Sequence, residues 1–104
     1  MSTTAPSFKD FDEFYAYYLT EHSNRTNRRI HFAGSTIGLI MAVTGVVTLQ
    51  LWLIPAAFIV GYGFAWFGHF FIEKNKPATF TYPWQSYKGD WRMWWEMLTG
   101  KIPF

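Results

Sequence analysis

The feature that most constrains this chain is a long central run without charge: residues 32–72 contain no Asp, Glu, Lys or Arg. One bilayer crossing takes about 20 apolar residues at a rise of about 1.5 Å each, so the run is long enough for about two crossings. It predicts an all-α membrane protein built on a two-helix transmembrane hairpin. We expect the transmembrane helices over about 30–49 and 53–74, with the turn around Gln50.

An aromatic segment precedes this run. Apolar residues recur at helical spacing over about 8–20, and Ser7 is the expected N-cap. The residues on this face are Phe8, Phe11, Tyr15, Tyr18 and Leu19. A helix of this kind suits the membrane interface, and packing on a soluble core explains the pattern equally well.

A tryptophan-rich segment follows the run. Pro77 and Pro83 predict an extended connection, and Asp90 is the expected N-cap of a last helix over about 90–99. Its predicted apolar face carries Trp91, Trp94, Trp95 and Leu98. Tryptophan at this density favours a second interfacial helix. We therefore expect residues 1–104 to form a single membrane domain, an amphipathic helix on each side of the hairpin.

Basic residues lie at both ends of the uncharged run. Arg25, Arg28 and Arg29 precede it, and Lys74 and Lys76 follow it. By the positive-inside rule, we expect both termini on the cytoplasmic side of the membrane. The membrane itself can be a bacterial inner membrane or an endoplasmic reticulum membrane. A net charge of +2 is too small to argue for nucleic acid as a partner, and the absence of cysteine excludes thiolate chemistry.

The three histidines of the chain all lie near the ends of this run. His31 directly precedes it and His69 lies near its far end, so a hairpin returns both to the same membrane surface. His22 precedes His31 by roughly two and a half helical turns, which points the two in opposite directions on one helix. They can serve one site only if the helix breaks between them, and Ser23-Asn24 permits a break.

Neutral imidazole is a common ligand of iron, zinc, copper and nickel, and three histidines leave positions open for water, substrate or O2. Glu73, one turn after His69, is a candidate fourth ligand or a group that orients His69. Asn27, one turn before His31, is a candidate partner of a ligand or of substrate. The alternatives are that the histidines are ordinary interfacial residues and that the arginines only set topology.

The polar residues fall into three motifs: Tyr18-x3-His22, Asn27-x3-His31-x2-Gly34 and Gly68-His69-x3-Glu73-Lys-Asn-Lys-Pro77-Ala78. Together these motifs resemble a membrane family long catalogued as a domain of unknown function. Its characterised members are Fe(II)-dependent 2-hydroxy fatty acid dioxygenases of fatty-acid α-oxidation. The resemblance covers nearly the whole chain, from about Phe8 to Phe104.

The resemblance implies an Fe(II) site at His22, His31 and His69, with Glu73 at a further family position and Asn27 in support. It implies that a 2-hydroxy fatty acid is shortened by one carbon with O2, releasing carbon dioxide. We expect one of three arginines to pair with the substrate carboxylate. The candidates are Arg25, Arg28 and Arg29.

Characterised members of that family are longer than this chain. A two-helix hairpin offers little wall for an acyl chain, so a homodimer could complete the pocket. Two other functions remain open. One is a metal-dependent lipid hydrolase, which would turn over without O2; the other is a non-catalytic membrane scaffold protein, whose histidines would touch lipid headgroups and bind no stoichiometric metal.

Overall fold

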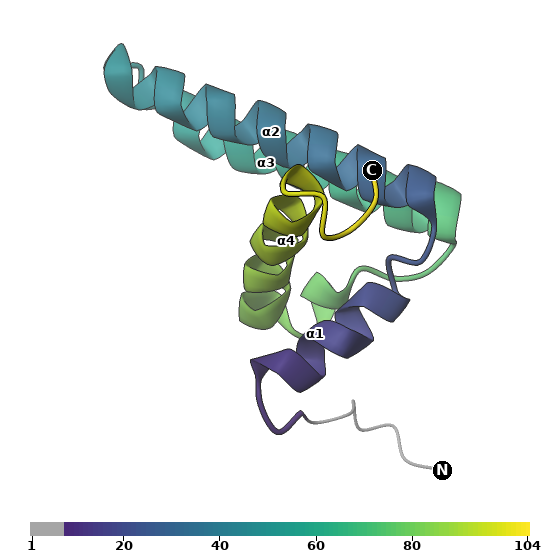
Figure 1. Ribbon diagram of the computed structural model, residues 1–104. Coiled ribbons are helices and arrows are strands. Elements are labelled where there is room, and N and C mark those ends of the chain that lie inside the picture. The colour runs from purple at the N-terminus through teal and green to yellow at the C-terminus, as the bar shows by residue number, and fades with distance from the viewer. Residues whose placement is uncertain (1–7) are drawn as a thin grey trace.

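The computed structural model describes residues 8–104, and within them the chain forms helices and no strand (Figure 1). Ser7, the predicted N-cap, lies outside the described residues, and Asp10 caps the first helix by accepting from the backbone N–H of Glu13 at 2.9 Å. The all-α prediction is therefore confirmed for this part of the chain. The elements are α1 (Phe11–Thr20), α2 (Arg25–Val47), α3 (Leu53–Phe67), a π-helical turn η1 (Gly68–Glu73), a 3₁₀ turn η2 (Ala78–Phe80) and α4 (Pro83–Leu98).

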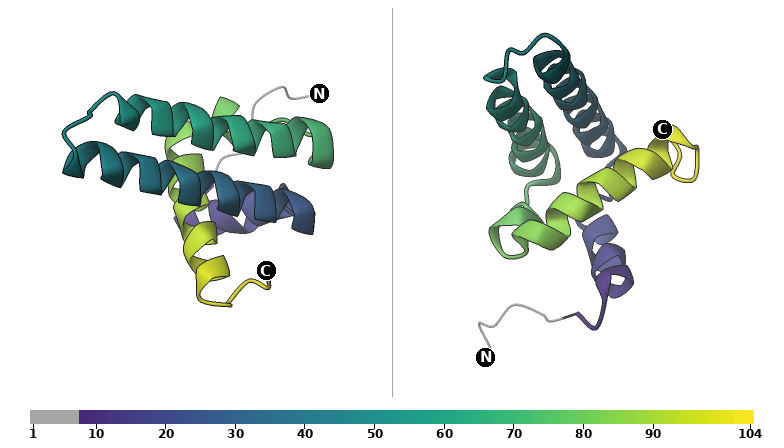
Figure 2. Two further views of the ribbon diagram at one scale, coloured as in Figure 1. Left: turned by 90° about the horizontal axis from the view of Figure 1, so that it is seen from above. Right: turned by 90° about the vertical axis from the view of Figure 1, so that its left-hand side faces the viewer.

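Helices α2 and α3 lie side by side and form the long arm of the molecule (Figures 1 and 2). Small residues allow this close approach: a methyl group added to Gly38 would stand 3.1 Å from the carbonyl oxygen of Ala57. α2 begins earlier than the predicted residue 30 because Asn24 caps it, accepting from the backbone N–H of Thr26 at 2.8 Å. α2 ends at Val47 and α3 begins at Leu53, so the connection between them includes Gln50.

The last helix is longer than predicted. α4 begins at Pro83, which occupies the first turn, where a missing N–H leaves no hydrogen bond unmade. Asp90 therefore lies in the middle of α4 and is not its N-cap. The packed face also differs from the prediction, because Trp95 and Leu98 are more than half exposed whereas Met93 is buried. Apolar residues occur on both sides of α4, so its pattern alone does not identify the side that packs.

α4 crosses the α2/α3 arm and carries α1 on its other side (Figure 2). Toward the arm, Nε1 of Trp94 donates to Oγ1 of Thr36 at 2.9 Å. Toward α1, the buried side chains of Phe14 and Tyr18 pack in one cluster with Met93. The aromatic face of α1 is thus buried against protein, as in the soluble-core alternative that the sequence left open.

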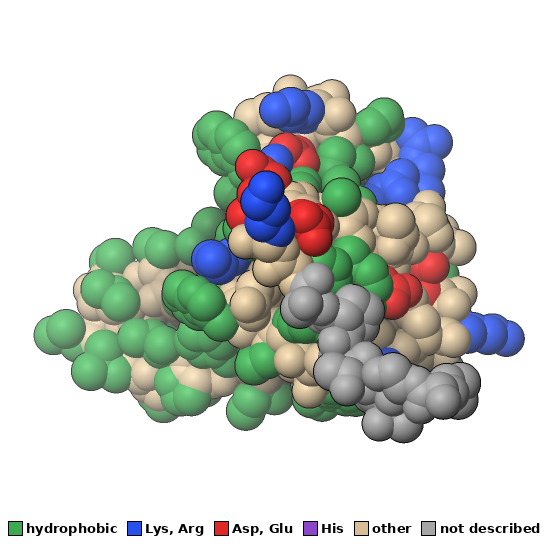
Figure 3. All heavy atoms as spheres, turned by 90° about the horizontal axis from the view of Figure 1, so that it is seen from below, with side chains coloured by type: hydrophobic (Ala, Val, Ile, Leu, Met, Phe, Trp, Pro, Cys, Tyr) green, Lys and Arg blue, Asp and Glu red, His purple; other side chains and the backbone are tan. Residues whose placement is uncertain are grey.

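Two segments of the described chain, Arg25–Val47 and Leu53–Glu73, are long and apolar enough to cross a membrane. At about 1.5 Å per residue the first is about 34 Å long, against a hydrocarbon core of about 30 Å. Only 17% and 22% of their apolar windows are buried, whereas a helix inside a soluble domain is mostly buried. Figure 3 shows hydrophobic side chains over the free end of the arm, with most charged side chains gathered elsewhere.

Candidate metal centre

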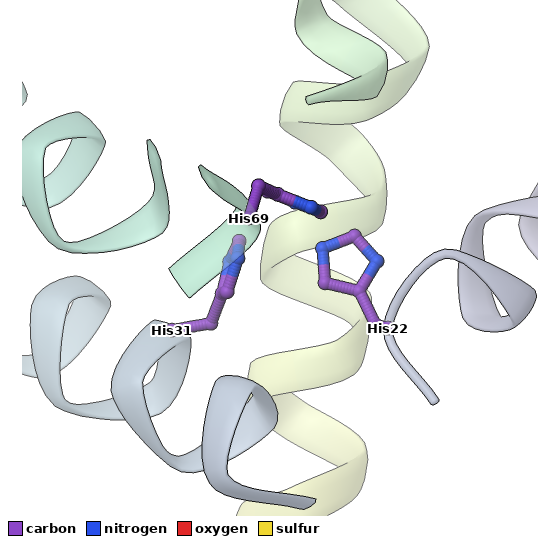
Figure 4. Close-up of side chains that lie close together, drawn as sticks. All are labelled: His22, His31 and His69. Atoms are coloured by element: carbon purple, nitrogen blue, oxygen red, sulfur yellow. The ribbon is translucent and has the colours of Figure 1, made fainter. Parts of the chain in front are cut away.

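The three histidines meet at one point in the structure. His22 comes from the loop after α1, His31 from α2 and His69 from η1, and their side chains converge (Figure 4). The ring centroid of His22 lies 4.5 Å from that of His31 and 4.4 Å from that of His69. One nitrogen of each histidine lies within 4.8 Å of the other two, and all three side chains are buried. Such a cluster could hold a metal ion.

His22 reaches the cluster because the chain breaks between α1 and α2. The break falls at the predicted Ser23-Asn24, so His22 is free of the helical phase that positions His31. Arg28 holds this loop in place, since its Nη1 donates to the carbonyl oxygens of His22 at 3.1 Å and Ser23 at 2.9 Å. A local cap and one arginine therefore bring two histidines together that one continuous helix would separate.

His69 lies in η1, where α3 widens into a π-helical turn of the kind often found at functional sites. Lys74 then adopts a left-handed backbone, with φ of 59°, and the chain folds back. Asn75 consequently donates from its backbone N–H to the carbonyl oxygen of His69 at 3.0 Å, and its Oδ1 lies 2.7 Å from His69 Nδ1. The sequence analysis did not single out Asn75, because a regular helix would place it on another face.

Two Nδ1 hydrogen bonds determine which ring nitrogen is free. Nδ1 of His22 lies 2.8 Å from the carbonyl oxygen of Tyr18, and because a carbonyl only accepts, Nδ1 carries the proton. The same holds for His69, since Nδ2 of Asn75 donates to two oxygens of Glu21 and leaves Oδ1 facing the histidine. Proteins commonly orient metal-ligating histidines through the second ring nitrogen in this way.

The histidine cluster also contains buried imidazole nitrogens that lack a hydrogen-bond partner among the described residues, as expected of atoms that could ligate a metal. Burial lowers the pKa of His22 to about 3, and repulsion from His69 acts in the same direction, so its ring is neutral and able to ligate. Nε2 of His22 and of His31 are buried without a hydrogen-bond partner among the described residues. A cavity of about 10 Å³ between the histidines, Ser86 and Asp90 has room for about one water-sized occupant.

The spacing of the donors fits one ion after small adjustments. Nitrogens bound to one ion at about 2.1 Å lie at most about 4.2 Å apart. The ligand nitrogens of the three histidines lie within 4.8 Å of one another, which is close to this limit, so a small contraction would let all three bind one ion. The residues present therefore fit a metal held by three imidazoles.

Glu73, the fourth predicted ligand, does not join the histidine group. Its Oε1 accepts from the backbone N–H of Asn24 at 2.6 Å and from Nδ2 of Asn27 at 3.4 Å, which ties the start of α2 to the end of η1. Direct ligation by Glu73 stays a prediction. Asn27 itself is fully buried and packs directly on Gly68, where a methyl group would overlap with its Oδ1.

The three predicted substrate-binding arginines bond to the backbone in this structure. Arg25 and Arg29 each donate from Nε to the carbonyl oxygen of Phe104, at 2.9 and 2.8 Å. Arg28 holds the loop of His22, as described above. These contacts give the arginines a structural part, and their pairing with a substrate carboxylate stays a prediction.

Asp90 is the second residue that the sequence analysis missed, since it was interpreted as a helix cap. Asp90 accepts a hydrogen bond from the hydroxyl of Tyr18, whose ring stacks on His22 with centroids 4.0 Å apart. Burial raises the pKa of the Asp90 carboxyl to about 7, and the Tyr18 hydrogen bond partly opposes this. Only the tertiary structure reveals the contact, because Tyr18 and Asp90 are 72 positions apart.

Comparison with known proteins bears on the same histidines. A family model described as 2-hydroxy-palmitic acid dioxygenase Mpo1-like matches residues 8–102 and so includes the whole histidine cluster. The chain belongs to this family. The resemblance drawn from the motifs is therefore confirmed, and the Mpo1-like family name indicates dioxygenase activity on 2-hydroxy fatty acids. No curated protein and no solved structure is significantly similar to this Mpo1-like chain.

Asn75→Ala is expected to lower the metal affinity of this Mpo1-like chain by about 10–100-fold, because His69 loses the acceptor that orients it. Titration with Co(II), followed by its visible absorption, measures the affinity. Lys76→Ala, at an exposed neighbouring position, is the matched control and should bind as the wild type does. Equal affinities for the wild type and Asn75→Ala would show that Asn75 does not support the site.

Proposed function

We propose that this chain is an Fe(II)-dependent membrane dioxygenase that shortens a 2-hydroxy fatty acid by one carbon. The observation that carries the proposal is the cluster of three buried histidines, in which Nε2 of His22 and Nε2 of His31 have no hydrogen-bond partner within residues 8–104. The reaction converts R–CH(OH)–COOH and O2 into R–COOH, CO2 and H2O. Atoms and electrons balance without a further reductant, which agrees with a chain that offers no cysteine and no motif for a second cofactor.

Each residue around the cluster has a proposed part in this reaction. Bound iron would supply the activation of O2 and the chelation of the substrate's carboxylate and hydroxyl. The backbone of Tyr18 and the side chain of Asn75 orient the histidines. Ser86 lines the small cavity, and its buried Oγ has no hydrogen-bond partner in the described part of the chain, so it could donate a hydrogen bond to a substrate oxygen. Asp90 lines the same cavity and can hold a proton on its carboxyl.

We further propose that the α2/α3 arm is inserted in the bilayer, with the histidine end at the cytoplasmic surface. The exposed apolar side chains of the arm support insertion, and those of Val47, Leu49 and Ile59 are each more than 70% exposed. The arginines of α2 and the lysines after η1 lie at the histidine end, as the positive-inside rule requires. Either a bacterial inner membrane or an endoplasmic reticulum membrane suits this arrangement.

The decisive experiment is turnover of 2-hydroxypalmitic acid by purified protein loaded anaerobically with Fe(II). We expect one molecule of a fatty acid one carbon shorter, and one of CO2, for each O2 consumed. Palmitic acid without the 2-hydroxyl is the substrate control. Turnover that proceeds without O2, or with zinc in place of iron, would contradict the proposal and favour a lipid hydrolase. No metal after loading would favour a scaffold protein.

A further inference from the structure

A second, larger cavity begins at His31 and follows the seam between α2 and α3. Its volume is about 210 Å³. Small residues such as Ala42 and Gly61 line it along the arm, and α4 closes it near the histidines with Asp90 and Trp91. From the sequence we expected that a two-helix hairpin alone would enclose little of an acyl chain. The structure supplies the third wall from α4, within one copy of the chain.

This cavity adjoins the metal centre, because residues of the histidine cluster form part of its lining. His31 and Asp90 line both the larger cavity and the small cavity between the histidines. Nε2 of His31 is buried, has no hydrogen-bond partner among the residues that the structure describes, and offers a ligand atom where the two cavities adjoin. A molecule with a polar head at the histidines can therefore extend an apolar tail between α2 and α3. Few of the lining groups beyond the junction are polar, which suits an alkyl chain and not a sugar or a peptide.

We propose that this cavity, the acyl groove, holds part of the alkyl chain of the substrate, and that Ala42 limits how many of its carbons the groove holds. The inference rests on the proposed function. A cavity of about 150 Å³ accommodates benzene, so the acyl groove takes roughly eight carbons of the chain. The remainder leaves past Leu39 and Phe58, which line the groove and are 38% and 48% exposed on the arm. The substrate thus enters sideways from the lipid.

A bulky side chain at the end of the acyl groove away from His31 should weaken the binding of substrates with long alkyl chains. Burial of one methylene contributes about fourfold to affinity, so displacing two of them costs on the order of tenfold. Ala42→Phe places a ring at the end of the groove away from His31. Val43→Phe is the matched control, because Val43 is the next residue, is 53% exposed and does not line the groove.

The first measurement locates the chain without needing turnover. The probe is a 2-hydroxy fatty acid of about eight to ten carbons with a photoreactive diazirine at its last carbon, added to metal-free protein in nanodiscs. We expect labelling of Leu39, Ala42 or Phe58 in the wild type and in Val43→Phe, and about tenfold less in Ala42→Phe. Equal labelling of the three proteins, or labelling spread over the outer faces of the arm, would overturn the groove.

The second measurement separates failure of the groove from failure of the proposed reaction. In iron-loaded protein, Ala42→Phe should shift the ratio of kcat/KM toward short 2-hydroxy acids by on the order of tenfold, and Val43→Phe should not. If the wild type is labelled as expected but shows no turnover, the proposal for the acyl groove stands and the proposed reaction is wrong. If Ala42→Phe turns over substrate with an unchanged chain-length preference, the proposal for the acyl groove is wrong and the proposed reaction stands.

The groove remains testable if Ala42→Phe does not fold, which its metal content would reveal. Gly61→Ala narrows the groove midway along α3, and the added methyl group meets only the carbonyl oxygen of Gly34, at an ordinary 3.8 Å. The same shift toward short chains is expected, with a smaller size. Unchanged labelling and preference in this variant would also overturn the proposal.

Discussion

His31→Ala is expected to abolish stoichiometric metal binding and to lower turnover of 2-hydroxy fatty acids by more than about a hundredfold. The loss should exceed the 10–100-fold that follows when only an orienting partner is removed, because the substitution deletes a donor nitrogen itself. Of the three histidines His31 alone lines the acyl groove, and its buried Nε2 has no hydrogen-bond partner in residues 8–104. Elemental analysis of wild type and variant, purified side by side, measures the loss.

Glu73→Gln is the informative companion to this variant. Glutamine keeps an oxygen that accepts from the backbone N–H of Asn24, so the link between η1 and α2 survives. If Glu73 only supports the site, Glu73→Gln should retain close to the wild-type metal content. A loss as complete as that of His31→Ala would make Glu73 a direct ligand. Wild-type protein that takes up no metal under anaerobic loading would defeat the metal site itself.

Gly68→Ala should destabilise the protein by about 1–3 kcal/mol and lower its Tm by roughly 10 °C. The added methyl group overlaps with Oδ1 of Asn27, which is fully buried and held from the other side by Glu73. Burial and this hydrogen bond restrict the movement of Asn27, so we expect the overlap to push η1 from α2. Because His69 and His31 belong to those two elements, we also expect weaker metal binding. Thermal unfolding in detergent, followed by circular dichroism, tests the stability.

Gly63→Ala is the matched control for this substitution. A methyl group on Gly63 meets nothing within 4 Å, so the variant should keep or raise the wild-type Tm, since alanine favours a helix by about 1 kcal/mol over glycine. In a background of Asn27→Ala the overlap disappears, and Gly68→Ala should then cost much less. Equal Tm values for Gly68→Ala and Gly63→Ala would show that the contact with Asn27 is not limiting.

Predictions from local pattern held where local chemistry decides the structure. The uncharged run predicted two long apolar helices, because helix length and hydropathy depend on neighbours in the chain. The break at Ser23-Asn24 was also predictable, since Asn24 caps α2 with its own side chain. Local pattern gave the wrong start for α4. Pro83 was interpreted as part of an extended connection, but proline also suits the first turn of a helix. Asp90 was interpreted as an N-cap, but it lies inside the helix.

Residue type and short spacing were enough to predict the helical class, the uncharged arm and the three histidines as candidate ligands. The groups that surround these histidines follow from the three-dimensional packing. Asn75 orients His69 because a π-helical turn and a left-handed residue reverse the chain, and Asp90 joins the site through Tyr18 from a distant helix. Helical periodicity carries no information on these contacts, since the first depends on an interruption of the regular helix and the second on how α4 packs against α1.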